Sequence, residues 1–225
     1  EAGVNVPDDQ FIPAVAKFCR ENQVLFMADE IQTGIARTGS LLAVCGDCNC
    51  QHECERQPGH YQKPDLVILG KALSGGVYPV SGVLADNHIM EVITPGTHGS
   101  TFGGNPLAAK VAIEALQVVY DERLMQNARQ LGIIFRSRME ELVEELEIVE
   151  KVRGKGLLNA IVVNDHPDSA TAWNICLRLR DNGLLAKPTH GNIIRFAPPL
   201  VMTEEELMEC VDIISRTLRE FEPTD

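Results

Sequence analysis

Two charged side chains directly follow the most apolar stretches of the sequence. Asp29 follows the run 24–28, and Lys71 follows the run 66–69 after a single glycine. A short, continuous apolar run is typical of a buried strand in a parallel sheet, and the carboxyl ends of such strands line the crevice in which open α/β sheets bind ligands. Each residue also has an ordinary interpretation: a surface lysine in a turn, and an aspartate that caps the next turn.

The surroundings of Lys71 narrow its chemistry. A phosphate loop of the form G-x-x-x-x-G-K-[ST] is excluded, because Asp65 occupies the first glycine position and Ala72 the serine or threonine position. A lysine that is desolvated at a strand end has a lowered pKa and can form a Schiff base with a carbonyl compound. A carboxylate such as that of Asp29 keeps the pyridine nitrogen of pyridoxal phosphate (PLP) protonated. Together the two residues would hold opposite ends of one ring.

The elements that must position these residues alternate between helix and strand. Apolar residues in 11–18 recur at helical spacing, and apolar strands follow at 24–28, 66–70 and 80–85. This order predicts an α/β layer with a mainly parallel sheet.

The second half of the sequence predicts longer helices and a separate set of strands. Asn105 and Pro106 predict a helix start, through a cap and a proline at the first helical position. A long amphipathic helix is expected from about 124 to 146. Strands at 157–163 and 192–197 then flank a helix, and a capping box of Thr203 and Glu206 starts the last helix. We place a domain boundary near residue 120, between 1–120 and 121–225.

Composition excludes several functional classes. The 225 residues are 44% hydrophobic and 23% charged, with a net charge of −12 and a pI of about 4.9. No basic stripe suits nucleic acid, and no apolar run approaches the ~20 residues of a membrane span. The start resembles no targeting peptide and lacks Met, so we expect part of a longer polypeptide. We expect a cytoplasmic location, with the mitochondrial matrix as the alternative.

Four of the seven cysteines crowd into one insertion, which we place at 45–60. Three interpretations stay open: a metal site, a redox-active pair of thiols, or a surface loop without an essential role. Zinc motifs usually separate two ligand pairs by about a dozen or more residues, whereas these residues crowd together, so we assign none of them as a metal ligand. The residues concerned are Cys45, Cys48, Cys50, Cys54, His52 and His60.

Four longer segments resemble, in this order, the motifs of class III (ω-amino acid) aminotransferases, which are PLP enzymes of fold type I. They are VLFMADEIQTGIARTG, PDLVILGKALSGGVYPVSGVL, HGSTFGGNPLA and RGKGLLNAIV. The segment 177–200 makes the resemblance greatest to the ornithine-specific members. The resemblance covers nearly the whole chain apart from the insertion and implies the C-terminal half of such an enzyme. It implies the C-terminal part of a PLP-binding large domain with a mainly parallel sheet, then a linking helix and an α+β small domain.

The resemblance assigns roles to individual residues. Lys71 matches the Schiff-base lysine, which also moves the proton between the two carbons of the substrate imine. Asp29 matches the carboxylate under the pyridine nitrogen, and Gln32 matches the side chain that reaches the phenolic oxygen of the cofactor. Ser100 and Thr101 match the pair that approaches the cofactor phosphate from the partner subunit, so a homodimer is implied.

Arg195 is the candidate for binding a substrate carboxylate. Strand alternation places Arg195 and Ile193 on one face of NIIRFA. An arginine fork binds a carboxylate through two parallel hydrogen bonds. By resemblance, Arg195 holds the α-carboxylate of 2-oxoglutarate or glutamate, and Glu1 neutralises this arginine while ornithine is bound.

The predicted reaction transfers the δ-amino group of ornithine to 2-oxoglutarate and gives glutamate semialdehyde and glutamate. Its substrates are small amino acids and 2-oxo acids. Two alternatives stay open: another ω-aminotransferase, acting on acetylornithine or 4-aminobutyrate, and an inactive fragment that lacks the N-terminal half.

Overall fold

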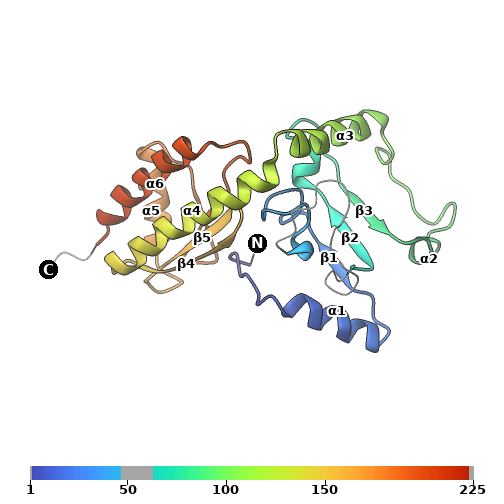
Figure 1. Ribbon diagram of the computed structural model, residues 1–225, viewed down its shortest axis with the longest axis horizontal. Coiled ribbons are helices and arrows are strands. Elements are labelled where there is room, and N and C mark those ends of the chain that lie inside the picture. The colour runs from blue at the N-terminus through green and yellow to red at the C-terminus, as the bar shows by residue number, and fades with distance from the viewer. Residues whose placement is uncertain (1, 47–62, 223–225) are drawn as a thin grey trace. The chain divides into compact units, whose positions relative to one another are not determined.

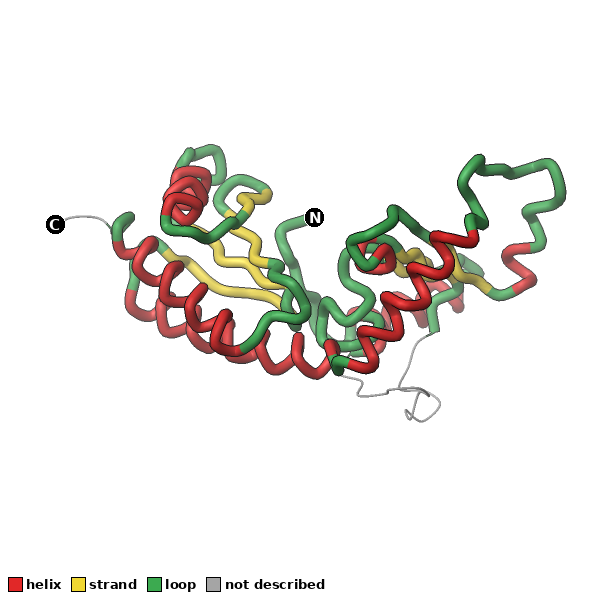
Figure 2. Tube along the Cα trace, turned by 90° about the horizontal axis from the view of Figure 1, so that it is seen from above, coloured by secondary structure: helices red, strands yellow, loops and turns green. Residues whose placement is uncertain are grey.

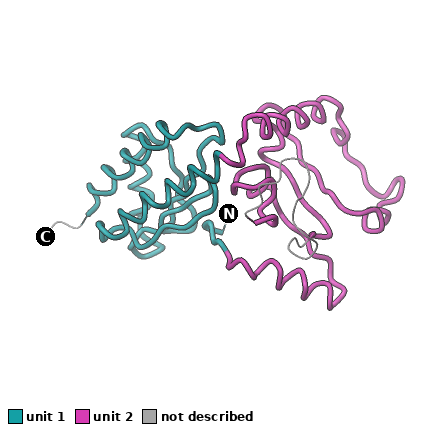
Figure 3. Tube along the Cα trace, in the orientation of Figure 1, with its two compact units in different colours: residues 1–6, 127–225 teal, residues 7–126 magenta. Residues whose placement is uncertain are grey.

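The computed structural model describes residues 2–46 and 63–222 (Figure 1). Glu1 and the insertion residues Cys48, Cys50, His52, Cys54 and His60 lie outside the described residues. The described chain contains both helices and strands (Figure 2). The chain divides into two compact units, which we call unit 2 (7–126) and unit 1 (1–6 with 127–225) (Figure 3). The assignment of these units to a large and a small domain stays a prediction.

Unit 2 contains a three-stranded sheet in the order β1-β2-β3. β1 and β2 run parallel, as the sequence predicts, whereas β3 pairs with β2 in the antiparallel direction. A parallel pair needs a crossover of about a dozen or more residues, usually a helix, and the β2–β3 connection contains only the short η2. The elements are α1 (Phe11–Glu21), β1 (Met27–Asp29), η1 (Ala43–Cys45), β2 (Leu66–Leu69), η2 (Lys71–Ser74), β3 (Gly82–Ala85), α2 (Asn87–Met90) and α3 (Pro106–Asp121).

Unit 2 leaves much of its apolar surface uncovered. Met27 of β1 is 59% exposed and Leu84 of β3 is 58% exposed. Most of the large, exposed apolar side chains among the described residues belong to this unit, including Phe11 and Phe18 of α1 and Ile113 of α3. Apolar surface of this kind marks an interaction face, so the sheet of unit 2 is suited to pack against further protein.

Unit 1 has a core of its own. Its sheet has the order β4-β5-β7-β6, all antiparallel, and three helices contribute to the same core cluster. Met139, Ile161 and Ile194 are fully buried there, from α4, β5 and β7 respectively. The elements are α4 (Leu124–Glu145), β4 (Val149–Lys155), β5 (Leu158–Val163), α5 (Thr171–Asp181), β6 (Lys187–Thr189), β7 (Ile193–Phe196) and α6 (Glu204–Arg219).

The two helix starts predicted from capping residues are confirmed. The Asn105 side chain accepts hydrogen bonds from the backbone N–H groups of Leu107 and Ala108 at the start of α3. Thr203 and Glu206 form a reciprocal capping box at the start of α6. Such caps satisfy backbone donors that have no partner within the helix.

The three cysteines outside the insertion, Cys19, Cys176 and Cys210, are free thiols. Cys19 and Cys210 are half-buried, whereas Cys176 is buried in the unit 1 core, where burial raises the pKa of its thiol to about 11. Among the described residues no group of His, Cys, Asp and Glu is arranged to hold a metal ion. In the described part of the chain, no helix combines the length and hydropathy required to cross a membrane.

Candidate active site

The carboxyl ends of β1 and β2 bring Asp29 and Lys71 to one edge of the sheet. Asp29 is the last residue of β1 and lies opposite Ile68 of β2. Lys71 follows β2 after Gly70 and opens η2. Since the strands are parallel, both residues leave the sheet at the same edge, and both are exposed there. The register therefore brings together the two residues that the sequence singled out.

The loops that follow the two strands touch each other. A Cβ placed on Gly70 would lie only 3.3 Å from Cγ2 of Ile31, the second residue after Asp29. Gly70 is buried and extended, so glycine allows the Asp29 loop to pack directly against the end of β2. This contact sets the distance between the loop that follows Asp29 and the loop that contains Lys71, which strand pairing alone does not.

Lys71 has an unusual backbone conformation. Its φ is +43°, in the left-handed region that is uncommon for residues other than glycine. Gly75 at the end of η2 has a φ of +56°, and a Cβ there would lie 3.1 Å from Cβ of Ala115 on α3. Strained backbone at the edge of a sheet is a feature of functional sites, and the packing of η2 on α3 holds it in place.

A buried glutamate organises the loop that carries Asp29. Glu30 is 2% exposed, and its carboxylate accepts hydrogen bonds from the Thr33 hydroxyl (2.6 Å) and from the N–H groups of Ala43 (3.0 Å) and Val44 (2.9 Å). Gln32, predicted to contact the cofactor, is half-buried in this loop. Sequence reasoning missed Glu30, because no spacing or motif separates a buried carboxylate from the exposed Asp29 next to it.

The same loop contains further constrained residues. Ile35 and Ala36 have φ values of +53° and +70°, and both are buried. Left-handed backbone at a β-branched residue persists only where the surrounding structure determines it. Burial also lowers the pKa of the Arg37 guanidinium from its usual value. The loop is therefore a rigid frame behind Asp29 and Gln32.

Ser100 and Thr101 lie apart from this edge. Both belong to a stretch, 91–104, in which every residue is exposed. The Ser100 hydroxyl accepts a hydrogen bond from the N–H of Gly103 (3.0 Å), and the segment between α2 and α3 extends beyond the sheet (Figures 1 and 2). The structure thus places the two residues on a projecting loop of unit 2.

Arg195 lies in unit 1, at the third position of β7. Ile194 and Phe196 are buried on the core side of this strand, and Ile193 and Arg195 are half-buried on the other side, as alternation predicts. Arg195 pairs in register with Ala160 of β5 and Lys187 of β6. Its predicted partner Glu1 lies outside the described residues.

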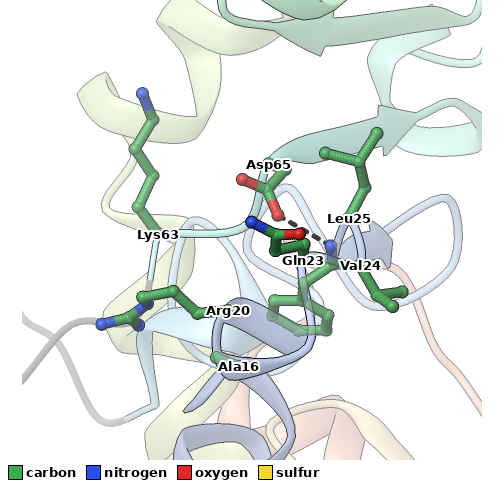
Figure 4. Close-up of a pocket in the computed structure, with 8 residues that line it drawn as sticks. Ala16, Arg20, Gln23, Val24, Leu25, Lys63 and Asp65 are labelled. Atoms are coloured by element: carbon green, nitrogen blue, oxygen red, sulfur yellow. Dashed lines mark hydrogen bonds between the residues drawn. The ribbon is translucent and has the colours of Figure 1, made fainter. Parts of the chain in front are cut away.

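A cavity of about 270 Å³ lies at the opposite end of the strands from Asp29 and Lys71 (Figure 4). Phe26 and Asp65 on its wall directly precede β1 and β2, and the Asp65 carboxylate accepts a hydrogen bond from the Phe26 N–H (2.7 Å). Lys63 at its rim pairs with Asp86 (2.7 Å). None of the residues predicted for the site lines this cavity.

Comparison with known proteins decides the family. The sequence model of the family described as "Aminotransferase class-III" matches residues 1–218. The chain belongs to the class III aminotransferases. This confirms the family and the fold that the motifs predict, and the Asp29–Lys71 edge is therefore the candidate active site of a class III aminotransferase half.

Relatives of this class III chain include enzymes named for ornithine. Mitochondrial ornithine aminotransferase of Rattus norvegicus is 55% identical over 98% of this chain and 47% of its own length. Ornithine aminotransferase of Plasmodium falciparum 3D7 is 47% identical over 99% of this chain and 50% of its own length. The chain spans about half the length of the curated relatives it matches.

Solved structures give the same picture of the fold. Acetylornithine aminotransferase from Elizabethkingia anophelis has 60% identity and a TM-score of 0.88, over 98% of this chain and 52% of that one. Ornithine δ-aminotransferase from P. falciparum, solved in work on its redox regulation, has 45% identity and a TM-score of 0.88, over 98% of this chain and 54% of that one.

We predict that Glu30 holds the loop after β1 in its folded conformation through the N–H groups of Ala43 and Val44. Glu30→Ala removes the acceptor of two backbone N–H groups, and an unsatisfied buried donor costs about 1–3 kcal/mol. Hydrogen exchange of the complete protein, followed by mass spectrometry, should show the amides of Ala43 and Val44 exchanging faster by about tenfold or more. Thr33→Val is the matched control, because it removes a hydroxyl donor to the same carboxylate but leaves both amides bonded. Equal exchange in Glu30→Ala and wild type would contradict this role.

Proposed function

We propose that the complete protein is a PLP-dependent aminotransferase that transfers the δ-amino group of ornithine to 2-oxoglutarate, giving glutamate semialdehyde and glutamate. The observation that carries this proposal is the common edge of Asp29 and Lys71 on two parallel strands, with Ile31 packed against Gly70. Curated ornithine aminotransferases support the choice of substrate, with identities of 55%, 51% and 47% to this chain.

The residues at the edge have the donor and acceptor chemistry that PLP requires. The Asp29 carboxylate is exposed and accepts a hydrogen bond from the Ile31 N–H (3.1 Å), so it retains acceptor capacity for a pyridine N–H. Lys71 would form the covalent link, and Gln32 would contact the phenolic oxygen. When bound, PLP supplies an electron sink for the substrate carbon. A structure of the Toxoplasma gondii ornithine aminotransferase is described with PLP at its active site.

The roles of the chain's own residues follow from their chemistry. The Lys71 amine would accept the proton from the substrate carbon and deliver it to the other carbon bonded to the transferred nitrogen. Asp29 would keep the pyridine nitrogen protonated. Arg195 binds the carboxylate of 2-oxoglutarate or glutamate through the two parallel hydrogen bonds of its guanidinium. Glu1 would neutralise Arg195 while ornithine is bound, so that one site accepts two different substrates in turn.

The proposed active form is a homodimer. Ser100 and Thr101 lie on a fully exposed, projecting segment, and the neighbouring Phe102 is 75% exposed. We assign this segment to the partner subunit's site, where the two hydroxyls would contact the cofactor phosphate. The cytoplasm is the proposed location, with the mitochondrial matrix as the alternative, because the rat relative is named mitochondrial and the Saccharomyces cerevisiae relative is not.

Lys71 is predicted to be the attachment point of PLP. Borohydride reduction of the complete wild-type protein should add the mass of the cofactor to the peptide that contains Lys71. Lys71→Ala should lose both this adduct and transamination, because alanine has no amine. Lys63→Ala is the control, since Lys63 lies at the other end of the strands. Transamination by Lys71→Ala would refute the assignment.

Substrate preference separates ornithine from the second candidate, acetylornithine, which the Elizabethkingia structure favours. Acetylation replaces a cationic ammonium group by a larger, neutral amide, and a site that pairs with the cation disfavours the acetylated form. We expect kcat/KM of the complete protein to be higher for ornithine than for acetylornithine or 4-aminobutyrate by about tenfold or more. A higher value for either competitor would replace the proposal by that activity.

The third hypothesis, an inactive fragment, concerns residues 1–225 alone. Because unit 2 leaves apolar faces exposed, this polypeptide should bind a hydrophobic dye and associate, and should neither hold PLP stoichiometrically nor transaminate. The complete protein, measured in parallel, is the control. Stoichiometric PLP and turnover in the isolated chain would eliminate the fragment hypothesis.

A further inference from the structure

The sheet of unit 1 has a second face, opposite the helices, which we call the outer face. Arg153 on β4 lies opposite Ala160 on β5, and Ala160 lies opposite Arg195 on β7. Directly paired residues of antiparallel strands project from the same face of a sheet. The core-facing residues Ile161 and Ile194 alternate with this row. Arg153 and Arg195 therefore flank one alanine on the outer face.

The outer face is buried at its centre although no helix of the core cluster packs there. Ala160 is 0% exposed and Val162 is 5% exposed, and neither belongs to the helix-covered core cluster. The N-terminal segment supplies cover. Gly3 is buried, and a Cβ on it would lie 2.7 Å from Cδ1 of Ile193 and 3.1 Å from Nη2 of Arg153. This segment thus passes over β5, between β4 and β7.

Arg153 makes a specific bond to this segment. Its Nε donates a hydrogen bond to the Gly3 carbonyl at 2.8 Å. The segment is a compact turn: Gly3 and Val4 have φ values of +85° and +56°, and the Asn5 side chain donates to the Ala2 carbonyl at 2.7 Å. A charged donor forms a stronger hydrogen bond than a neutral one. Arg153 is therefore the anchor of a strained turn.

The strand positions of the outer face carry no carboxylate that could pair with Arg195. These positions, taken from the register, carry cations or uncharged side chains: Lys151, Arg153, Lys155, Leu158, Ala160, Val162, Lys187, Thr189, Ile193 and Arg195. Lys151 pairs with Glu150 (2.8 Å), the residue at the register shift of β4. A carboxylate that is to weaken the binding of anions by Arg195 must therefore come from outside these strand positions. In the proposed function this carboxylate is that of Glu1, two positions before Gly3 in the sequence.

We propose that Arg153 is a positioning residue: by holding the Gly3 carbonyl, it fixes the Ala2–Asn5 turn over Ala160 and so sets how strongly Arg195 binds substrate carboxylates. The inference rests on the proposed function, in which Arg195 must bind glutamate and yet tolerate ornithine. Arg153 itself contacts no substrate. Loss of the hydrogen bond from Arg153 to Gly3 should lower kcat/KM for ornithine relative to kcat/KM for glutamate.

The test compares two amino donors in the complete protein. In Arg153→Met, which keeps the length of the side chain but donates no hydrogen bond, the ratio of kcat/KM for ornithine to that for glutamate should fall by about tenfold, the effect of one charged hydrogen bond. The change should be in KM for ornithine, with KM for 2-oxoglutarate not raised. Arg153→Lys retains a cationic donor and should restore part of the ratio. Lys151→Met, on the same face, should leave it unchanged.

A second variant moves the turn while leaving Arg153 in place. Gly3→Ala introduces a Cβ 2.7 Å from Ile193 at a left-handed position, so it should shift the ratio in the same direction. Hydrogen exchange at residues 2–6 should accelerate in Arg153→Met and in Gly3→Ala, irrespective of activity. Combining Arg153→Met with Glu1→Gln should add little to either change alone, because under this proposal Arg153 acts through Glu1.

The outcomes separate the two proposals. If KM for 2-oxoglutarate rises as much as that for ornithine, Arg153 binds substrate directly or acts only on folding, and the positioning role is wrong. The same holds if exchange at 2–6 is unchanged in Arg153→Met. If the wild type does not use ornithine, the proposed function fails, and the exchange measurement alone decides whether Arg153 holds the turn.

Discussion

The parallel pairing of β1 with β2 is the constraint on which the candidate site depends. It brings Asp29 and Lys71 to one edge although the whole β1–β2 connection separates them in the sequence. Pairing alone leaves the separation of the two loops open. The packing of Ile31 on Gly70 sets it, and the left-handed backbone of Lys71 turns the chain away from the strand at that point. Together these three features place an acid and an amine at one edge, as the proposed shared ligand requires.

The two units differ in the source of their stability. Unit 1 buries side chains such as Met139, Ile161 and Leu218 in one core formed by a sheet and three helices. Unit 2 has three short strands, and side chains such as Met27 and Leu84 stay exposed. Burial of apolar surface is the dominant favourable term in folding, so unit 2 depends on additional apolar contacts for a comparable core. The Asp29–Lys71 edge thus lies in the unit that depends more on further contacts.

Local signals in the sequence predicted part of this structure. Asn105 and the Thr203–Glu206 pair mark helix starts because the side chains themselves satisfy the helix termini. The alternation of Ile193 to Phe196 gave the orientation of Arg195. Strands β4 and β6 were missed, because β4 is rich in charge and β6 is a three-residue edge strand that contains Pro188.

Non-local features were beyond the reach of the sequence. β3 is antiparallel to β2 because no crossover helix connects them. The apolar run that forms β3 does not itself indicate in which direction the strand pairs. The burial of Glu30 depends on residues 43 and 44 folding back onto it, and the bond from Arg153 to Gly3 joins residues 150 positions apart in the sequence. Motifs predicted the polar residues that we propose for the site, whereas the contacts that hold their loops required coordinates.

The hydrogen bonds that hold η1 affect how a change in length of the following cysteine-rich stretch acts on the fold. Glu30 binds the N–H groups of Ala43 and Val44, and the Ser40 hydroxyl donates to the Gly46 carbonyl, so the chain is tied down directly before the cysteine-rich stretch begins. Lys63, where the described chain resumes, pairs with Asp86. Because Glu30, Ser40 and Asp86 hold the chain on both sides of this stretch, each doubling of its length adds only about 0.6 kcal/mol of loop-closure entropy. The contacts that frame Asp29 therefore depend on the ends of the stretch and not on its length.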